Sequence, residues 1–288
     1  MRRVWLSFAV ALTTLALLTG CGSKPAGGAA GAANAGAPVA GASDAGGATS
    51  PVVLRVGVTA GPHEQIMKEV AKLLEPQGIR LDIKVFTDYK IPNQALEAGD
   101  LDLNSFQHQP YLDTENKERG FHLVSIARTV TFPMGVYSRK IQKLDEIRQG
   151  GTVAIPNDPT NGGRALLVLQ QAGLIKLKPE AGILASPRDV VENPKGLRFQ
   201  ELDAAQLPRV LPDVDAAVIN TNYAMEAGLN PRKDAIFVEQ NSPYVNVIAV
   251  REKEKDRPEF RKVVEAYHSP QIRKFIEETF QGAVVPGF

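Results

Sequence analysis

The sequence alternates between short apolar runs and longer segments with one apolar face, which is the pattern of strands followed by helices. Residues 53–58 and 81–86 predict two strands, and a helix that begins near Pro62 lies between them. Helices are predicted at 91–98 and 110–119, and each is followed by a glycine that ends it. Repeated strand–helix–strand units predict a largely parallel sheet with helices on both faces.

A second series of the same kind occupies the later part of the chain. Strands predicted at 152–155 and 215–219 flank a strongly apolar helix at 162–172. A strand at 244–250 and a helical stretch at 259–280, interrupted by a Ser-Pro pair, complete the pattern. Two such series predict an α/β protein with two lobes, and ligands of α/β proteins bind in the crevice where strand ends meet.

Residues 1–20 have the pattern of a secretory signal peptide. Two arginines precede an apolar run that is shorter than the roughly 20 apolar residues of a membrane-spanning helix. The motif Leu-Thr-Gly-Cys at 18–21 then resembles the bacterial lipobox, whose cysteine is acylated before cleavage. We therefore predict a lipid on Cys21, the single cysteine of the chain. The alternative is an ordinary signal peptide that happens to contain a cysteine.

Residues 21–51 are predicted to be the acylated cysteine and a flexible tether, because they consist almost entirely of Gly, Ala, Ser and Pro. A second acyl chain makes membrane anchoring stable. The predicted location is the cell envelope, anchored to a membrane and facing the periplasm or the outside. Gly22 stands where an aspartate often marks inner-membrane retention, which favours the outer membrane but leaves the choice open.

The charge balance and the scattered histidines exclude several classes of protein. Loss of Arg2 and Arg3 with the signal peptide changes the formal net charge from +1 to −1. A nearly neutral chain without a basic block is not expected to bind nucleic acid. The sequence contains no paired metal-ligand motif and no Gly-x-Ser-x-Gly elbow. We expect no metal and no cofactor.

Residues 100–103 lead into a third predicted strand, and aromatic and amide side chains gather directly after it in segment 104–111. Phe106, His108 and Tyr111 fall within six positions, and Tyr89 follows the second predicted strand. Together they predict one wall of a pocket. The alternative is that these rings are plain core, but the amides of the same segment are costly in a dry core.

Segment 156–164 joins a predicted strand to the apolar helix and contains Asn161 and Arg164. Free N–H groups at a helix N-terminus favour an anion, and an arginine can clamp a carboxylate through two parallel hydrogen bonds. The alternative is that Asn161 caps the helix and Arg164 lies on its surface. Asn220 and Asn246 stand at the boundaries of two further strands, where turn chemistry alone also explains asparagine.

Six segments occur in an order that resembles the methionine-binding lipoproteins of ABC import systems, the NlpA-type family. They are residues 88–89, 104–112, 153–161, 190–194, 217–220 and 242–246. The resemblance implies a periplasmic-binding-protein fold of type II-like form, with a ligand cleft between two lobes and two chain crossings at the hinge. It implies a first lobe of residues 53–129 plus 246–288 and a second lobe of residues 130–245.

The resemblance also implies eight ligand-binding residues. They are Tyr89, Phe106, His108, Tyr111, Asn161, Arg164, Asn220 and Asn246. The first four correspond to an aromatic wall around the ligand side chain, which suits a thioether. The arginine corresponds to the partner of the ligand carboxylate, and the asparagines hold the polar end of an amino acid. Two glycines precede the arginine, and many relatives have a bulkier residue at the first of these positions, so we expect the glycines to loosen this loop.

The function that the resemblance implies is capture of methionine between two lobes and its delivery to a permease and its ATPase. L-Methionine is the expected ligand, and the alternatives are D-methionine, a methionine derivative or a short methionine-containing peptide. The protein is expected to be a monomer and not an enzyme. Two readings from other classes remain: a surface hydrolase that uses His108 with a nearby Asp or Ser, and a surface protein that engages a partner.

Overall fold

The computed structural model describes residues 50–288. The predicted signal peptide, the lipid on Cys21 and nearly all of the predicted tether lie outside the described residues. Within the described part of the chain, no helix has the length and apolar character that a membrane crossing requires.

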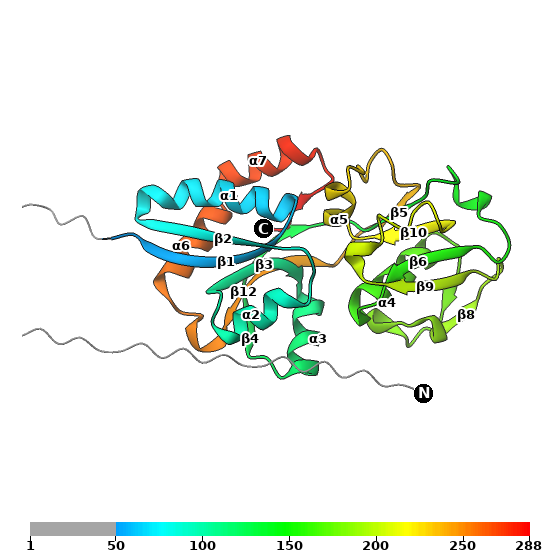
Figure 1. Ribbon diagram of the computed structural model, residues 1–288, viewed down its shortest axis with the longest axis horizontal. Helices are drawn as coiled ribbons and strands as arrows, with labels where there is room; N and C mark the ends of the chain where they lie inside the picture. Colours follow the sequence, from blue (N-terminus) through cyan, green and yellow to red (C-terminus); the bar gives the residue numbers. More distant parts are fainter. Residues whose placement is uncertain (1–49) are drawn as a thin grey trace, which may run out of the picture. The chain divides into compact units, whose positions relative to one another are not determined.

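The first lobe is built on a six-stranded sheet with the order β13-β4-β12-β3-β1-β2 (Figure 1). Its strands are β1 (Val52–Thr59), β2 (Ile79–Phe86), β3 (Leu103–His108), β4 (Leu123–Thr131), β12 (Val245–Arg251) and β13 (Val285–Pro286). The sheet thus combines strands from the beginning of the described chain with strands from its end.

The second lobe is built on a five-stranded sheet with the order β11-β5-β10-β6-β9. Its strands are β5 (Gly135–Tyr137), β6 (Thr152–Pro156), β9 (Arg198–Leu202), β10 (Ala216–Ile219) and β11 (Phe237–Val238). A small separate pair is formed by β7 (Lys176–Leu177) and β8 (Val190–Glu192). All strands of this lobe come from one continuous stretch of chain.

The prediction of largely parallel sheets is wrong, because both sheets are mixed. In the first sheet only β1–β2 and β1–β3 are parallel, whereas β12 is antiparallel to both β3 and β4. In the second sheet β6 is parallel to β9 and β10, but β5 is antiparallel to β10 and β11. The chain leaves the first sheet along β4 and returns along β12, so these two strands run in opposite directions.

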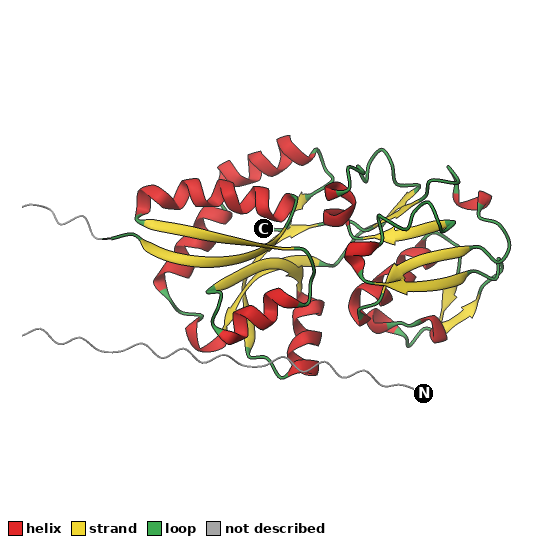
Figure 2. Cartoon of the chain, in the orientation of Figure 1, coloured by secondary structure: helices red, strands yellow, loops and turns green. Residues whose placement is uncertain are grey.

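Helices cover the sheets as the apolar periodicity predicts (Figure 2). They are α1 (Pro62–Leu74), α2 (Ile91–Ala98), α3 (Gln109–Arg119), α4 (Pro159–Gln171), α5 (Thr221–Glu226), α6 (Pro258–Tyr267) and α7 (Pro270–Phe280). The predicted stop of the second helix is confirmed at Gly99, which adopts a left-handed φ of 87°. The predicted break near the C-terminus is also confirmed, because Ser269 caps α7 by accepting a hydrogen bond from the Ile272 N–H.

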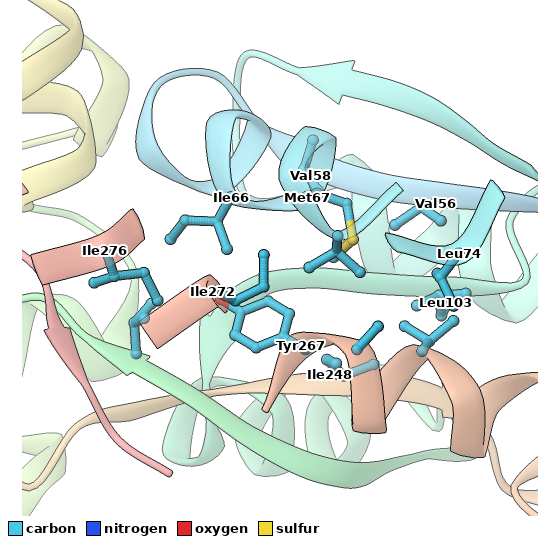
Figure 3. Packing of buried hydrophobic residues seen from close by; sticks show 14 of the residues in the cluster. Val56, Val58, Ile66, Met67, Leu74, Leu103, Ile248, Tyr267, Ile272 and Ile276 are labelled. Carbon is cyan, nitrogen blue, oxygen red and sulfur yellow. The ribbon is translucent and has the colours of Figure 1, made fainter. Parts of the chain in front are cut away.

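The largest part of the core lies between α1, α6, α7 and the first sheet (Figure 3). Met67 of α1, Tyr267 of α6 and Ile276 of α7 are at most 1 % exposed. Full burial of a large apolar side chain stabilises a protein by about 1.5–3 kcal/mol. The apolar face of α4, including Leu166 and Leu169, forms a second core under the five-stranded sheet. Each sheet is therefore held by its own core.

Two segments connect the lobes, residues 132–134 and residues 239–244. They contact each other, because the Glu239 N–H donates to the Met134 carbonyl at 2.8 Å. Strand β4 runs to Thr131, two residues past the end predicted for the first segment of lobe one. The predicted lobe boundaries themselves stay a prediction.

Candidate ligand-binding site

A cavity with about 350 Å³ of space between its atoms, part of it open to solvent, has walls from both lobes. All eight residues that were predicted to bind a ligand line it. Four lining residues were not predicted: Gln107, Phe132, Thr221 and Asn222. The structure therefore brings together residues that are up to 157 positions apart in the sequence, from Tyr89 to Asn246.

Strand β3 carries two of these residues, and here the structure corrects the prediction. Segment 104–111 was expected to follow a strand, but Phe106 and His108 lie on β3 itself, which is buried along its whole length. Its amides are satisfied within the protein, since Gln107 Nε2 donates to Asn93 Oδ1 at 2.6 Å and Asn104 Nδ2 donates to the same atom at 2.9 Å. The polar side chains made this segment look unlike a buried strand. They can be buried because each amide has a hydrogen-bond partner inside the protein.

Three rings form the aromatic wall in the first lobe. Tyr89 and Phe106 have centroids 5.9 Å apart, and Tyr111, on α3, lies 6.0 Å from Tyr89 and 6.1 Å from Phe106. The Tyr89 hydroxyl donates to Asn222 Oδ1 in the second lobe at 2.6 Å. Burial raises the pKa of both tyrosines. Their hydroxyls stay protonated, so the wall is apolar and uncharged.

His108 is held as a neutral ring between α3 and α4. Its Nδ1 accepts a hydrogen bond from the Tyr111 N–H at 3.1 Å, so the proton lies on Nε2, which donates to Asn161 Oδ1 at 3.2 Å. Burial, assisted by the charge of Arg164, lowers the pKa of His108 to about 3. Both ring nitrogens are engaged by partners other than Asp or Ser.

Helix α4 begins at Pro159, three residues before its predicted start. Its N-cap is Asp158, whose carboxylate accepts from the Asn161 N–H at 2.9 Å. The alternative reading, in which Asn161 caps the helix and Arg164 lies on its surface, is therefore wrong. Arg164 is only 3 % exposed and lines the cavity.

The guanidinium of Arg164 is fixed mainly by residues of the connections between the lobes. Nε donates to Glu239 Oε1 at 3.0 Å, and Nη2 donates to Glu239 Oε2 at 2.5 Å. Nη2 also contacts the Phe132 carbonyl at 2.7 Å and Ser242 Oγ at 3.1 Å, and the Tyr244 ring lies 4.4 Å away. None of the hydrogen bonds of Arg164 within residues 50–288 uses Nη1, which leaves that nitrogen for a ligand.

The asparagines provide complementary hydrogen-bonding groups. Asn161 Oδ1 accepts from Asn220 Nδ2 at 2.8 Å as well as from His108. Among the described residues, Asn220 Oδ1 and Asn222 Nδ2 are buried without a partner. Leaving such an atom unsatisfied costs about 1–3 kcal/mol. Asn246 pairs with His108 across β12 and β3 and so joins the same wall.

Glu239 and Asp158 are the charged residues near this site that the sequence analysis missed. Asp158 belongs to a segment that was considered, and its position before Pro159 is a cap signal. Glu239 lies 75 residues after Arg164 in a polar loop. Nothing in the sequence distinguishes it from an exposed glutamate.

The two glycines before Arg164 do not loosen the chain, contrary to expectation. Both lie inside α4 and both are buried. A Cβ on Gly162 would stand 2.8 Å from the Pro156 carbonyl oxygen, and a Cβ on Gly163 would overlap the backbone of Ile183. The glycines are therefore positions of close backbone packing.

We expect Gly163→Ala to lower the free energy of unfolding by about 1–3 kcal/mol, the range for overpacked sites. Alanine in place of glycine inside a helix would otherwise stabilise by about 0.5–1 kcal/mol. Chemical denaturation measures the difference, and its sign separates the two cases. A more stable variant would contradict the close packing of α4 against residues 182–185.

The comparisons with known proteins agree with this architecture. The NlpA lipoprotein family model matches residues 54–288. The D-methionine-binding lipoprotein MetQ of Salmonella typhimurium is 48 % identical over 239 residues, which cover 82 % of this chain and 88 % of that protein. Outer membrane lipoprotein 3 of Mannheimia haemolytica is 46 % identical over 237 residues, with coverage of 82 % and 90 %.

A solved structure extends the similarity to three dimensions. A nutrient-binding protein from Burkholderia cenocepacia bound to methionine aligns with a TM-score of 0.80 at 52 % identity, covering 82 % of this chain and 100 % of that one. The predicted two-lobed α/β fold is thereby confirmed. Because the family model spans the whole described body apart from its first residues, this chain belongs to the NlpA lipoprotein family.

Proposed function

We propose that this protein binds methionine between its lobes and delivers it to the permease of an ABC importer. The observation that carries the proposal is the pairing of an aromatic wall with free polar groups in one cavity. Arg164 Nη1 and Asn222 Nδ2 are donors for a carboxylate, and Asn220 Oδ1 is an acceptor for an ammonium. An amino acid with an apolar side chain satisfies all of these groups at once.

The side-chain end of the cavity suits a thioether. Sulfur is polarizable, and its contacts with aromatic rings are worth about 0.3–1.5 kcal/mol each. Tyr89, Phe106 and Tyr111 present ring faces and edges within one cluster. The names and structures of the relatives include proteins that bind methionine, which supports the same ligand class here.

Contacts between the lobes at the site support a mechanism of ligand-driven closure. Tyr89 of the first lobe donates to Asn222 of the second, and His108 of the first lobe donates to Asn161 of the second. A ligand shifts a protein toward the closed form only if it binds that form better. Methionine in this cavity contacts residues of both lobes and so meets that condition.

Isothermal titration calorimetry with L-methionine, D-methionine and a panel of other amino acids tests the proposal. We expect heat with methionine and little with leucine, which has a similar volume but no sulfur. We propose L-methionine as the preferred enantiomer, and the D-methionine-binding name of the relatives makes D-methionine the direct competitor. A protein that ignores the whole panel, and whose native mass spectrum shows no bound small molecule, would contradict the proposal.

The proposal also covers the location of the protein and the transporter that it serves. The family and its named members are lipoproteins, in line with a lipid-anchored protein of the cell envelope. We propose a monomer that docks in its closed form on the permease, whose ATPase then drives import. Stimulation of the reconstituted transporter's ATPase by the methionine-loaded protein, but not by the ligand-free protein, is the expected result.

The ion pair between Lys90 and Asp203 bridges the lobes at the surface and is expected to contribute little. Its nitrogen and oxygen atoms are 2.8 Å apart, but the two side chains are 55 % and 30 % exposed. Exposed ion pairs are typically worth about 0–1 kcal/mol. Lys90→Ala should change methionine affinity by less than about fivefold. A loss of a hundredfold in calorimetry would make this pair a principal latch of the closed state.

A further inference from the structure

Glu239 does not line the cavity, but its side chain binds the guanidinium of Arg164, which does. Its carboxylate accepts two hydrogen bonds from Arg164 and a third from the Met134 N–H at 3.0 Å. Both side chains are only 3 % exposed, so salt screens their charges weakly. The positive charge of Arg164 is therefore balanced before any ligand enters.

The amino end of α4 also faces a carboxyl group of the chain, Asp158, although burial raises the pKa of that group. A helix N-terminus attracts anions through its free N–H groups and its dipole. Asp158 already takes that place, because it accepts from the Asn161 N–H at 2.9 Å and from Asn161 Nδ2 at 3.0 and 3.1 Å. The anion site that the sequence predicted for this loop is thus filled by a carboxylate of the chain itself.

No further positive charge reaches the cavity wall within residues 50–288. Arg164 is the one lysine or arginine among the lining residues. His108 is neutral, because burial lowers its pKa to about 3. The rest of the wall consists of aromatic rings, amides and a threonine. The site therefore contains one cation whose charge is already neutralised.

We infer that Glu239 and Asp158 make this site select a net-neutral zwitterion over an anion of the same shape. The inference rests on the proposed binding of an amino acid here. A ligand carboxylate at Arg164 Nη1 is repelled by the Glu239 carboxylate, which binds the same guanidinium through Nε and Nη2, and buried charges interact more strongly than solvated ones. A ligand ammonium offsets that repulsion and donates to Asn220 Oδ1. A carboxylic acid without the ammonium meets the repulsion alone.

The test compares L-methionine with L-2-hydroxy-4-(methylthio)butanoate, which has the same carboxylate and thioether but a hydroxyl in place of the ammonium. Calorimetry at pH 7.5 on the full-length chain gives the ratio of the two affinities. We expect Glu239→Gln to shift this ratio toward the hydroxy acid by at least about fivefold, because the substitution removes the repulsion. Any displacement of Arg164 affects both carboxylates alike and cancels in the ratio.

Asp158→Asn is an independent second variant. Asparagine caps helices as well as aspartate does, so the substitution removes the charge and keeps the cap. We expect a shift in the same direction, of at least about twofold, because this carboxylate is also solvated by the helix N-terminus. This variant tests the inference even if Glu239→Gln unfolds, which thermal denaturation reveals.

Asp215→Asn is the matched control in the same lobe. Asp215 accepts from Arg148 Nε at 2.8 Å, from Arg148 Nη2 at 3.3 Å and from the Thr152 N–H at 2.7 Å. This is the contact pattern of Glu239, but neither Asp215 nor its partners line the cavity. The affinity ratio should stay within about twofold of the wild-type value, because solvent screens the distant charge.

The outcomes separate the inference from the proposed function. Folded Glu239→Gln and Asp158→Asn variants that bind methionine with an unchanged ratio would overturn the inference and leave methionine binding intact. An equal shift in the Asp215→Asn control would overturn it as well, because general destabilisation would then be the cause. A wild-type chain that binds neither ligand would overturn the proposed function and the inference together.

Discussion

Arg164→Ala is expected to lower the affinity for methionine at least tenfold. The substitution removes the one cationic group of the cavity wall within the described residues. A hydrogen bond to a charged group contributes about 1.5–3 kcal/mol, and about 1.4 kcal/mol corresponds to a factor of ten in affinity. Calorimetry measures the loss. Near-wild-type affinity would exclude Arg164 as the partner of the ligand carboxylate.

The same substitution is also expected to destabilise the protein. It leaves the Glu239 carboxylate buried without its ion-pair partner, and breaking a buried pair from one side costs about 3–5 kcal/mol. The double variant Arg164→Ala/Glu239→Gln removes that charge as well. It should regain part of the stability in urea unfolding but none of the affinity, which separates binding from folding.

Arg148→Ala is the control for this experiment. Arg148 pairs with Asp215 in the second lobe, but its side chain is 67 % exposed and does not line the cavity. We expect methionine affinity within about twofold of wild type, because neither Arg148 nor its partner Asp215 lines the cavity. Comparable losses in the two variants would point to a general effect of removing arginine.

Acid is expected to destabilise the protein well above the pH at which carboxylates titrate. Burial lowers the pKa of His63 and of His108 to about 3, below the ordinary value of 6.5. Between these values the unfolded chain binds more protons than the folded one, so stability is complete above pH 6.5 and falls as the pH decreases. Each histidine should cost about 2 kcal/mol between pH 7 and pH 5.

Urea unfolding of the ligand-free protein at pH 7 and pH 5 measures this loss. His63 lies in α1 with its ring 4.6 Å from that of Phe132, and it does not line the cavity. His63→Phe should therefore remove about half of the pH dependence and leave the contribution of His108. If the variant retains the full dependence, His63 does not titrate as a buried neutral ring.

Much of the local structure was predictable because its signals lie within a few residues of one another. The glycine after α2 ends that helix in a left-handed conformation, and the Ser-Pro pair separates α6 from α7. Both are local backbone requirements that can be recognised in the sequence. The resemblance to a known family predicted the eight cavity residues as one set. Side chains fixed by short-range pattern, such as the apolar face of α4, also needed no tertiary information.

Strand direction and strand identity needed the tertiary structure. Strand β12 enters the first sheet between β3 and β4 only after the chain has built the second lobe, so no local pattern indicates an antiparallel partner. Strand β3 is buried although it is rich in amides, because Asn93, on α2, pairs with Gln107 and Asn104. The sequence pattern placed these residues after a strand and not on it.

The sequence by itself determined the repeated α/β pattern, the glycine stops of α2 and α3, the break before α7, and the residue types that can bind an amino acid. Only the tertiary structure decided how these residues are charged and held. Arg164 and Glu239 meet because the chain crosses between the lobes twice, and Gly163 is small because the backbone of Ile183 lies against it. Such contacts join residues far apart in the chain, where neither propensity nor periodicity contains information about distance.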